Sequence, residues 1–454
     1  MKQMKEKNIL AGNVYKALIL LAVPIMLNSL LQTIYNLTDT FWLGRLGAEH
    51  MAAITLVSPL QSFITSFGGG LTAGGTVILS HHFGSGHKEN CRYAVNQMFM
   101  LIMAFSVFAG AILFLGCGMI LRGMGAEGNV LNYAAAYQRI MAADIPLIYM
   151  ASLYTIVHNA AGKTGKPLAL NFIGIVINMV LDPLFIVVFG WGASGAALST
   201  VLAKLPCAVI SMALLTRKSA DIRITPFKVK PDLKIISSIA KVGLPMAIGN
   251  SAMQFGFVLM SKSVMAYGTA AVAAYGIGNK INGLVSTPSS AMSNAVSIMS
   301  GQTKGAGMRE RGVSAMKAGM IMMVGLLAVT GFIISRSTVA TALAGVFSSD
   351  TSVVPNTANF LGVMAAMAWT NGVYDSAKGY LNGQGRTVST VTINAARIWV
   401  FRFAILLLCQ KIFHMGVESI WYAVTYSNAV SSVVMGLYAV FVIKSDGRRD
   451  IKQI

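Results

Sequence analysis

Charge is scarce in this chain of 454 residues. Only 11% of the residues are charged, against roughly a quarter in soluble domains. Acidic residues are the scarcer kind, because 15 Asp and Glu stand against 35 Lys and Arg. Hydrophobic residues make up 55% of the chain instead. A soluble globular protein is excluded, since its surface would need far more charged side chains than this.

Several chemical signatures are missing as well. No glycine stands five residues before Gly162-Lys163-Thr164, so this stretch is not a phosphate-binding loop and ATP is not implied. No G-x-S-x-G element indicates a hydrolase. Neither disulfides nor zinc are indicated by the four scattered cysteines, which we interpret as apolar core residues: Cys91, Cys117, Cys207 and Cys409. No carboxylate arrangement or H-E-x-x-H pattern supports metal binding by the clustered His81, His82 and His87, so we predict no metal site there. We predict that the chain is not an enzyme.

Long apolar runs are what the chain has in abundance. A helix needs about 20 mostly apolar residues to cross a bilayer, and these runs lack the alternation of a membrane β-barrel. The fold class predicted is therefore all-α integral membrane. The first run continues past Leu37, too far for a signal peptide. We expect about twelve spans, at 15–43, 51–80, 93–118, 132–157, 168–190, 194–216, 239–266, 271–300, 313–334, 355–381, 388–412 and 418–443.

The basic residues test this count of spans. With both termini in the cytoplasm, most Lys and Arg fall in cytoplasmic segments, while the outer loops hold only Arg45, Arg122, Arg336 and Lys411. One miscounted span would invert every later loop and destroy the asymmetry. The net charge of +20 is therefore a signal of topology and of attraction to anionic lipid, not of nucleic acid. We predict a multi-pass protein of the cell membrane with both termini cytoplasmic.

The chain divides into two similar halves. A basic linker with two prolines, at 217–238, separates an N-lobe at 1–216 from a C-lobe at 239–443, and a cytoplasmic tail follows at 444–454. A shift of 221 residues places Pro24 on Pro245 and Gly84 on Gly305. Six spans per half make the repeat parallel, with a pseudo-twofold axis along the membrane normal and an expected substrate site between the halves.

The order of these features resembles the multidrug and toxic compound extrusion (MATE) family. The resemblance rests on the Pro24 helix that runs into Asp39, on Gly44-Arg45-Leu46-Gly47, on His82-Phe-Gly84-Ser-Gly86, on Asn178-Met-Val-Leu-Asp182-Pro183, and on Gly192-Ala-Ser-Gly195. It covers nearly the whole chain and is closest to the bacterial and archaeal, DinF-like branch. It implies an antiporter that expels amphipathic, often cationic compounds in exchange for Na⁺ or H⁺ by alternating access. We expect a monomer without other cofactors.

Four acids lie inside the expected spans, where a charge needs a partner or a function. Asp39 sits in a polar stretch of the first span. Asp182 follows Asn178 by four residues, so both side chains share one helix face and offer oxygen ligands for a cation, or a proton carrier. The resemblance implies one ion site formed by Asp39, Asn178, Asp182 and Thr200, with Asn159 as a weaker member. For Asp144 we expect a structural or gating role.

The second half departs from other branches of the family. Gln254 and Asn371 stand where acids would lie, with Asp375 one turn later and three residues before Lys378, with which it could simply pair. A second ion site is therefore in doubt. The residues that we consider for a substrate cavity are Tyr35, Asn36, Met253, Gln254, Met260, Tyr275, Met292, Asn371 and Asp375. Flexible thioethers suit a promiscuous apolar cavity.

Two other functions remain open. A flippase for lipid-linked sugars would need a strongly basic cavity and often has additional helices. An ion channel would need a pore-lining filter, and the sequence shows no re-entrant filter segment.

Overall fold

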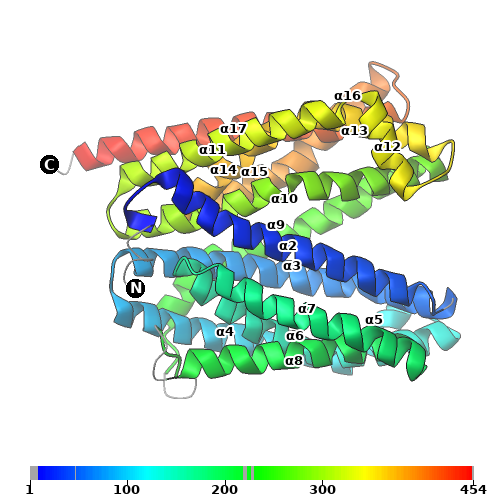
Figure 1. Cartoon of the computed structure of the whole chain (residues 1–454), viewed down its shortest axis with the longest axis horizontal. Helices are drawn as coiled ribbons and strands as arrows, with labels where there is room; N and C mark the ends of the chain where they lie inside the picture. The colour runs from blue at the N-terminus through cyan, green and yellow to red at the C-terminus, as the bar shows by residue number, and fades with distance from the viewer. Residues whose placement is uncertain (1–8, 47, 218–221, 226–229, 452–454) are drawn as a thin grey trace. The chain divides into compact units, whose positions relative to one another are not determined.

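A computed structural model describes residues 9–46, 48–217, 222–225 and 230–451. All regular secondary structure in this part of the chain is helical, as Figure 1 shows, which confirms the predicted class. Nine of the described helices are long and apolar enough to cross a membrane. The free cysteines are all buried, as expected.

Each half follows the same order of helices. The first half contains α2 (Val14–Leu43), α3 (Ala48–Gly84), α4 (Lys88–Leu115), α5 (Cys117–Gly123), α6 (Gly128–Ala160), α7 (Gly165–Pro183) with the π turn η1 (Leu184–Val188), and α8 (Gly192–Thr216). The second contains α9 (Leu233–Met265), α10 (Thr269–Gly305), α11 (Arg309–Ile334), α12 (Ser337–Phe347), α13 (Val353–Ala366), α14 (Trp369–Gly383), α15 (Thr387–Ala396) with η2 (Arg397–Arg402) and α16 (Phe403–Lys411), and α17 (Glu418–Ile451).

The repeat predicted from glycine and proline positions is visible in these bounds. Helices α3 and α10 are each 37 residues long, and their first residues, Ala48 and Thr269, differ by the predicted shift. A short helix follows the third span in both halves, at α5 and at α12. Neither short helix was predicted, because both lie in segments that the sequence indicates as outer loops.

The chain forms two compact units that do not coincide with the two expected lobes. Unit 1 comprises Met1–Met26 and Ile248–Ile454, and unit 2 comprises Leu27–Ala247. The first part of α2 belongs to unit 1 because Leu18 and Leu21 are buried against residues of the second half, Met292 and Met299 among them. Both changes of unit occur two residues after a proline, Pro24 in α2 and Pro245 in α9. Backbone hydrogen bonding is interrupted at these positions.

The described part of the expected linker is packed rather than solvated. Ile222 and Ile224 are buried in the core of unit 2. Asn96 of α4 accepts a hydrogen bond from the Thr225 amide at 2.8 Å. Gln97 donates to the carbonyl oxygen of Lys230 at 2.9 Å. Two buried side chains of α4 therefore bind the segment that precedes α9. Helix α9 begins at Leu233, inside the segment expected to be linker.

The span expected at 355–381 is broken. Helix α13 ends at Ala366 and α14 begins at Trp369, and the turn between them contains short-range bonds such as that from the Thr370 amide to the Met367 carbonyl, at 3.0 Å. Helix α14 then packs very closely on α10. A Cβ added to Gly379 would lie 2.3 Å from the backbone carbonyl oxygen of Ser293 on α10. Any side chain larger than that of glycine would therefore push the two helices apart.

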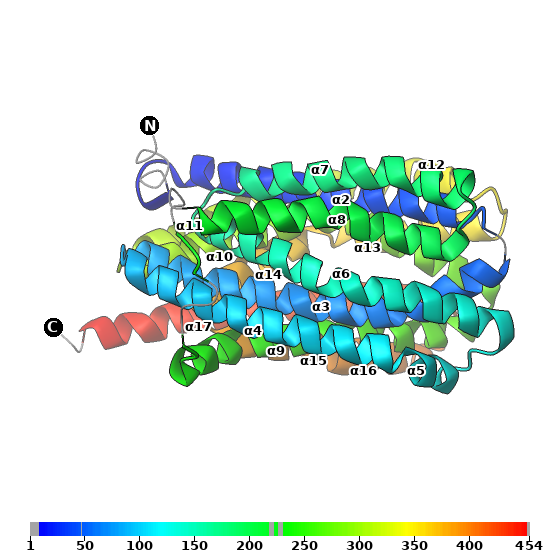
Figure 2. The ribbon, with the colours of Figure 1, turned by 90° about the horizontal axis from the view of Figure 1, so that it is seen from below.

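Unit 2 has the layout that positions the buried acids. Helices α4, α6 and α8 run alongside one another, with α6 in contact with both neighbours (Figures 1 and 2). Helix α7 lies against α8. Polar side chains of α6, α7 and α8 therefore meet within one unit.

Candidate functional site

The acids of unit 2 are deeply placed. Asp144 on α6 and Asp182 on α7 are both 0% exposed, while Asp39 on α2 is half-buried. Asp39 interacts electrostatically with Asp182 and with Lys204 of α8. Three acids and one lysine thus gather in the membrane-spanning part of a single unit.

Asp182 is the centre of a hydrogen-bonded group that we call the α7–α8 polar set: Asn178, Asp182 and Ser199. Asn178 donates to Asp182 Oδ1 at 3.2 Å, as the four-residue spacing predicts. The Ser199 hydroxyl donates to the same oxygen. The other carboxylate oxygen, Asp182 Oδ2, and the amide oxygen of Asn178 are buried without a hydrogen-bond partner among the described residues. These two unsatisfied oxygens could coordinate a small hard cation, or the carboxylate could take up a proton.

The local sequence explains why Ser199 reaches Asp182. Pro183 follows the aspartate and has no N–H, and the π turn η1 begins at the next residue. Helix α8 then packs against η1. A Cβ on Gly195 would lie 2.7 Å from the backbone carbonyl oxygen of Phe185. Only glycine permits this approach, and Ser199 lies one turn further along α8.

Most of the predicted ion-site residues come together. Tyr35, which we had assigned to a cavity, lies with its hydroxyl 3.5 Å from Thr200 Oγ1. Tyr35 also interacts electrostatically with Asp39 and Asp182. The Thr200 hydroxyl donates to the Ala196 carbonyl at 3.0 Å, and no hydrogen bond joins it to a carboxylate among the described residues.

Asn159 is not brought to this group. Its carbonyl oxygen accepts the Gly162 amide at 2.9 Å in the turn that ends α6. Asp182 lies 17 residues beyond the start of α7 at Gly165, which is about 25 Å along the helix. Asn36 is exposed and pairs only loosely with Gln32, at 3.5 Å.

Two participants were missed by sequence reasoning. Ser199 was passed over for its neighbour Thr200. Lys204 was not considered for the site, yet its Nζ lies 2.6 Å from Asp144 Oδ2. Its four-residue spacing from Thr200 was the available signal, because it places the ammonium on the same face of α8.

The candidate cavity residues of unit 1 are mostly core residues. Met260 and Tyr275 are 0% and 5% exposed and belong to one apolar cluster, where the Tyr275 ring stacks on Phe360 at 5.9 Å. Met292 is 3% exposed in another cluster. Neighbouring side chains cover these three in the described part of the chain, and their assignment to a substrate cavity stays a prediction.

The remaining unit 1 candidates are more polar. Asn371 is half-buried and its carbonyl accepts the Ser289 hydroxyl at 3.2 Å. Asp375 is 8% exposed and interacts electrostatically with Lys378. Met253 accepts a hydrogen bond from Asn394 through its sulfur. The side chain of Gln254 lies outside the described residues.

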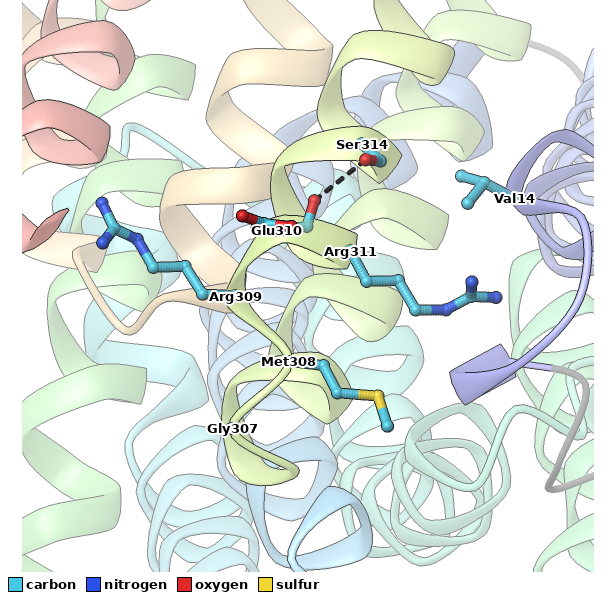
Figure 3. A pocket seen from close by; sticks show the side chains of 7 residues that line it. All are labelled: Val14, Gly307, Met308, Arg309, Glu310, Arg311 and Ser314. Carbon is cyan, nitrogen blue, oxygen red and sulfur yellow. Dashed lines mark hydrogen bonds between the residues drawn. The ribbon is translucent and has the colours of Figure 1, made fainter. Parts of the chain in front are cut away.

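A pocket of about 680 Å³ lies elsewhere, at the start of α11, and no predicted site residue lines it. Figure 3 shows Arg311 reaching from α11 toward the segment before Val14, with Arg309 pointing the other way. Arg311 donates to the carbonyl oxygens of Ile9, Ala11 and Gly12 at 2.9–3.1 Å. Arg311 therefore binds the segment before α2 to the rest of unit 1.

Apolar helices in two repeated halves, with buried acids in the spans, are typical of multi-pass membrane transporters. The MatE family model matches residues 24–184 and 245–408, one match in each half. The chain belongs to the MATE family of transporters, and it is accordingly a transporter and not an enzyme. The family resemblance predicted from the sequence is confirmed; the narrower assignment to one branch stays a prediction.

Curated relatives are similar over much of their length. The chain is 28% identical to "Probable multidrug resistance protein YpnP" of Bacillus subtilis over 68% of this chain and 69% of that protein. It is 25% identical to "Multidrug export protein MepA" of Staphylococcus aureus over 84% of each.

Solved structures share the fold. One described as "MATE in the bent conformation" has a TM-score of 0.91 at 22% identity and covers 98% of both chains. An outward-facing "multidrug resistance MATE family transporter of the MOP superfamily" has a TM-score of 0.88 at 22% identity, over 96% of this chain and 97% of the other. The architecture of twelve spans in two lobes is therefore shared with this family.

Proposed function

We propose that this chain is a secondary active multidrug exporter that expels amphipathic compounds in exchange for Na⁺ or H⁺. Family membership and relatives described as multidrug export or resistance proteins support the efflux of small molecules. The α7–α8 polar set supports the coupling. Its unsatisfied oxygens on Asn178 and Asp182 lie in a transmembrane unit, where an ionisable group needs a partner or a function.

The set has the chemistry for a coupling ion. An ionised Asp182 with the amide oxygen of Asn178 offers oxygen ligands to Na⁺, while a protonated Asp182 would donate its own hydrogen to a neighbouring oxygen. Asp39 adds a second carboxyl group within electrostatic reach. Two acids close together hold a cation or a proton more strongly than one does, because their like charges repel each other.

Coupling requires that the ion and the drug favour different states of the transporter. The ion can shift the equilibrium only by the difference in its affinity for the two states. In this proposal, ion binding at Asp39 and Asp182 stabilises a state with low drug affinity, and drug is released outside. The protein acts as a monomer in the cell membrane with both termini in the cytoplasm, as the distribution of basic residues supports.

The test is efflux of a fluorescent lipophilic cation from proteoliposomes under an imposed Na⁺ gradient or, separately, an imposed pH gradient. Asp182→Asn keeps the shape of the side chain but removes its ionisation. We expect gradient-driven efflux to fall by at least tenfold in this variant. Glu89→Gln is the matched control, because Glu89 is 88% exposed on α4.

Two results would contradict the proposal. Full gradient-driven efflux by the Asp182→Asn protein would remove the coupling role of the set. Electrogenic ion flux by the wild-type protein without any exchange for drug would favour a channel instead.

A further inference from the structure

The charged side chains within the described spans of unit 1 are mostly basic, whereas those within the spans of unit 2 are mostly acidic. Residues 239–443 contain four acids, and three of them, Glu310, Asp350 and Glu418, lie at helix ends or in loops. Asp375 is the acid that remains within a span. Against it stand three cations in α14 and η2: Lys378, Arg397 and Arg402.

Arg397 lies well inside a membrane-spanning segment, Thr387–Lys411. It lies ten residues after the start of α15 at Thr387, which is about 15 Å into the membrane-spanning segment. Half the hydrocarbon thickness is about the same distance. An arginine at that depth is costly unless an anion, an acceptor-rich surface or a water-filled cavity faces it.

Two helices present matching faces at this point. Tyr374 and Lys378 are four residues apart on α14, while Asn394 and Arg397 are three apart on the next helix, so each pair shares a helix face. The Tyr374 hydroxyl donates to Asn394 Oδ1 at 2.9 Å. The Arg397 guanidinium lies over the Tyr374 ring, 4.9 Å from its centre. The four side chains therefore form one cluster, which we call the α14–α15 donor cluster.

Donors outnumber acceptors in this cluster. Arg397 Nε is buried and has no acceptor among the described residues. Asn394 gives an amide hydrogen to the sulfur of Met253, and a thioether is only a weak acceptor. Lys378 interacts electrostatically with Asp375 and also with Arg397, so the one acid is set against two cations. Arg402, 3% exposed, adds a further positive charge within electrostatic reach of Arg397.

Surplus donors of this geometry suit a carboxylate. An arginine and a lysine beside an amide offer charge-assisted hydrogen bonds to both oxygens of one anionic group. The aromatic ring of Tyr374 adds a surface for the apolar body next to that group. Lys378 and Arg397 are both half-buried, so part of each side chain is exposed.

We propose that Lys378, Arg397 and Asn394, beside Tyr374, form a subsite for the carboxylate of an amphipathic substrate. This proposal rests on the proposed export function and specifies its substrate class. Unit 2 supplies the acids for the coupling ion, while unit 1 favours amphipaths with an anionic group over simple cations.

The experiment compares two probes that differ in one charge, a fluorescent quinolone carboxylate and its methyl ester. Gradient-driven transport of each is measured in proteoliposomes of the wild type and of Arg397→Gln. We expect the KM for the carboxylate to rise about tenfold, since a charge-assisted hydrogen bond is lost, and the KM for the ester to change less than about twofold. Arg397→Lys should restore part of the preference.

Arg336→Gln is the matched control. Arg336 also stacks on an aromatic ring, at 4.2 Å from the centre of Phe332, but it lies at a helix end outside the cluster. Lys378→Gln, on the other helix, repeats the test if Arg397→Gln does not fold. Folding of each variant is followed by thermal unfolding.

The outcomes separate the two proposals. Equal effects of Arg397→Gln and Lys378→Gln on both probes, or wild-type transport of the ester and of a lipophilic cation but not of the carboxylate, would overturn the subsite and leave the export function standing. A wild-type protein that transports none of the three probes would overturn the export function itself, and the subsite with it.

Discussion

The pair of Lys204 and Asp144 offers the sharpest test of how unit 2 tolerates its buried acids. The two atoms Lys204 Nζ and Asp144 Oδ2 are 2.6 Å apart, and Asp144 is 0% exposed. Its second oxygen, Oδ1, has no hydrogen-bond partner among the described residues. Replacing Lys204 by Met therefore leaves a buried carboxylate without its counter-charge.

The expected cost follows from this geometry. Breaking a buried ion pair by removing one partner costs about 3–5 kcal/mol. The Lys204 side chain is 34% exposed, so solvent already weakens the pair and we take about 3 kcal/mol. At about 2–4 °C per kcal/mol for a body of this size, the Tm should fall by about 10 °C.

The double variant distinguishes an ion pair from ordinary packing. In Asp144→Asn with Lys204→Met, neither charge remains, so most of the lost stability should return. Thermal unfolding of purified protein in detergent measures each Tm. Lys88→Met is the control, because Lys88 is an exposed lysine at the start of α4. A double variant no more stable than Lys204→Met alone would refute the reasoning.

Three further outcomes are expected. Ser199→Ala should lower gradient-driven efflux at least tenfold more than Thr200→Ala, because the Ser199 hydroxyl donates to Asp182 whereas the Thr200 hydroxyl donates to the Ala196 carbonyl; equal losses in efflux assays would count against this. Gly195→Ala should lower the Tm by several degrees, since its Cβ would lie 2.7 Å from a backbone oxygen, whereas Gly165→Ala, with open space around it, should not. Hydrogen bonds from Ser352 lower the pKa of Asp350, so this loop acid stabilises the start of α13 above pH about 4 and loses that effect as the pH falls further. Hydrogen exchange at 350–353 should show this pH dependence in the wild type and not in Asp350→Asn.

The topology could be predicted because its signals lie along the chain. Hydrophobic length and the distribution of Lys and Arg predicted the spans, and the shift that places Pro24 on Pro245 predicted the repeat. The bounds of α3 and α10 agree with that shift. The prediction of one continuous span at 355–381 failed because the break depends on local backbone geometry. A break at 367–368 within an apolar run leaves no mark on hydropathy.

The candidate site was predictable within one helix and not between helices. Asn178 and Asp182 share a face because α-helices repeat every 3.6 residues, and that pairing is observed. The sequence did not indicate that Ser199 would be the third member, since its approach depends on Gly195 and the π turn η1. Met260 and Met292 were considered for a cavity, but packing against neighbouring helices buried them.

By itself, the sequence determined that this chain crosses the membrane many times in two repeated halves, with its few intramembrane acids mainly in the first. Hydrophobic periodicity and hydropathy are properties of a single segment. They can therefore be determined without knowing which segments pack beside it. Only the tertiary structure decided which partner each buried charge has: Ser199 for Asp182, Lys204 for Asp144 and the Tyr374 ring for Arg397. Such pairings join residues on different helices, and the rotation and approach of those helices come from packing between side chains distant in the sequence.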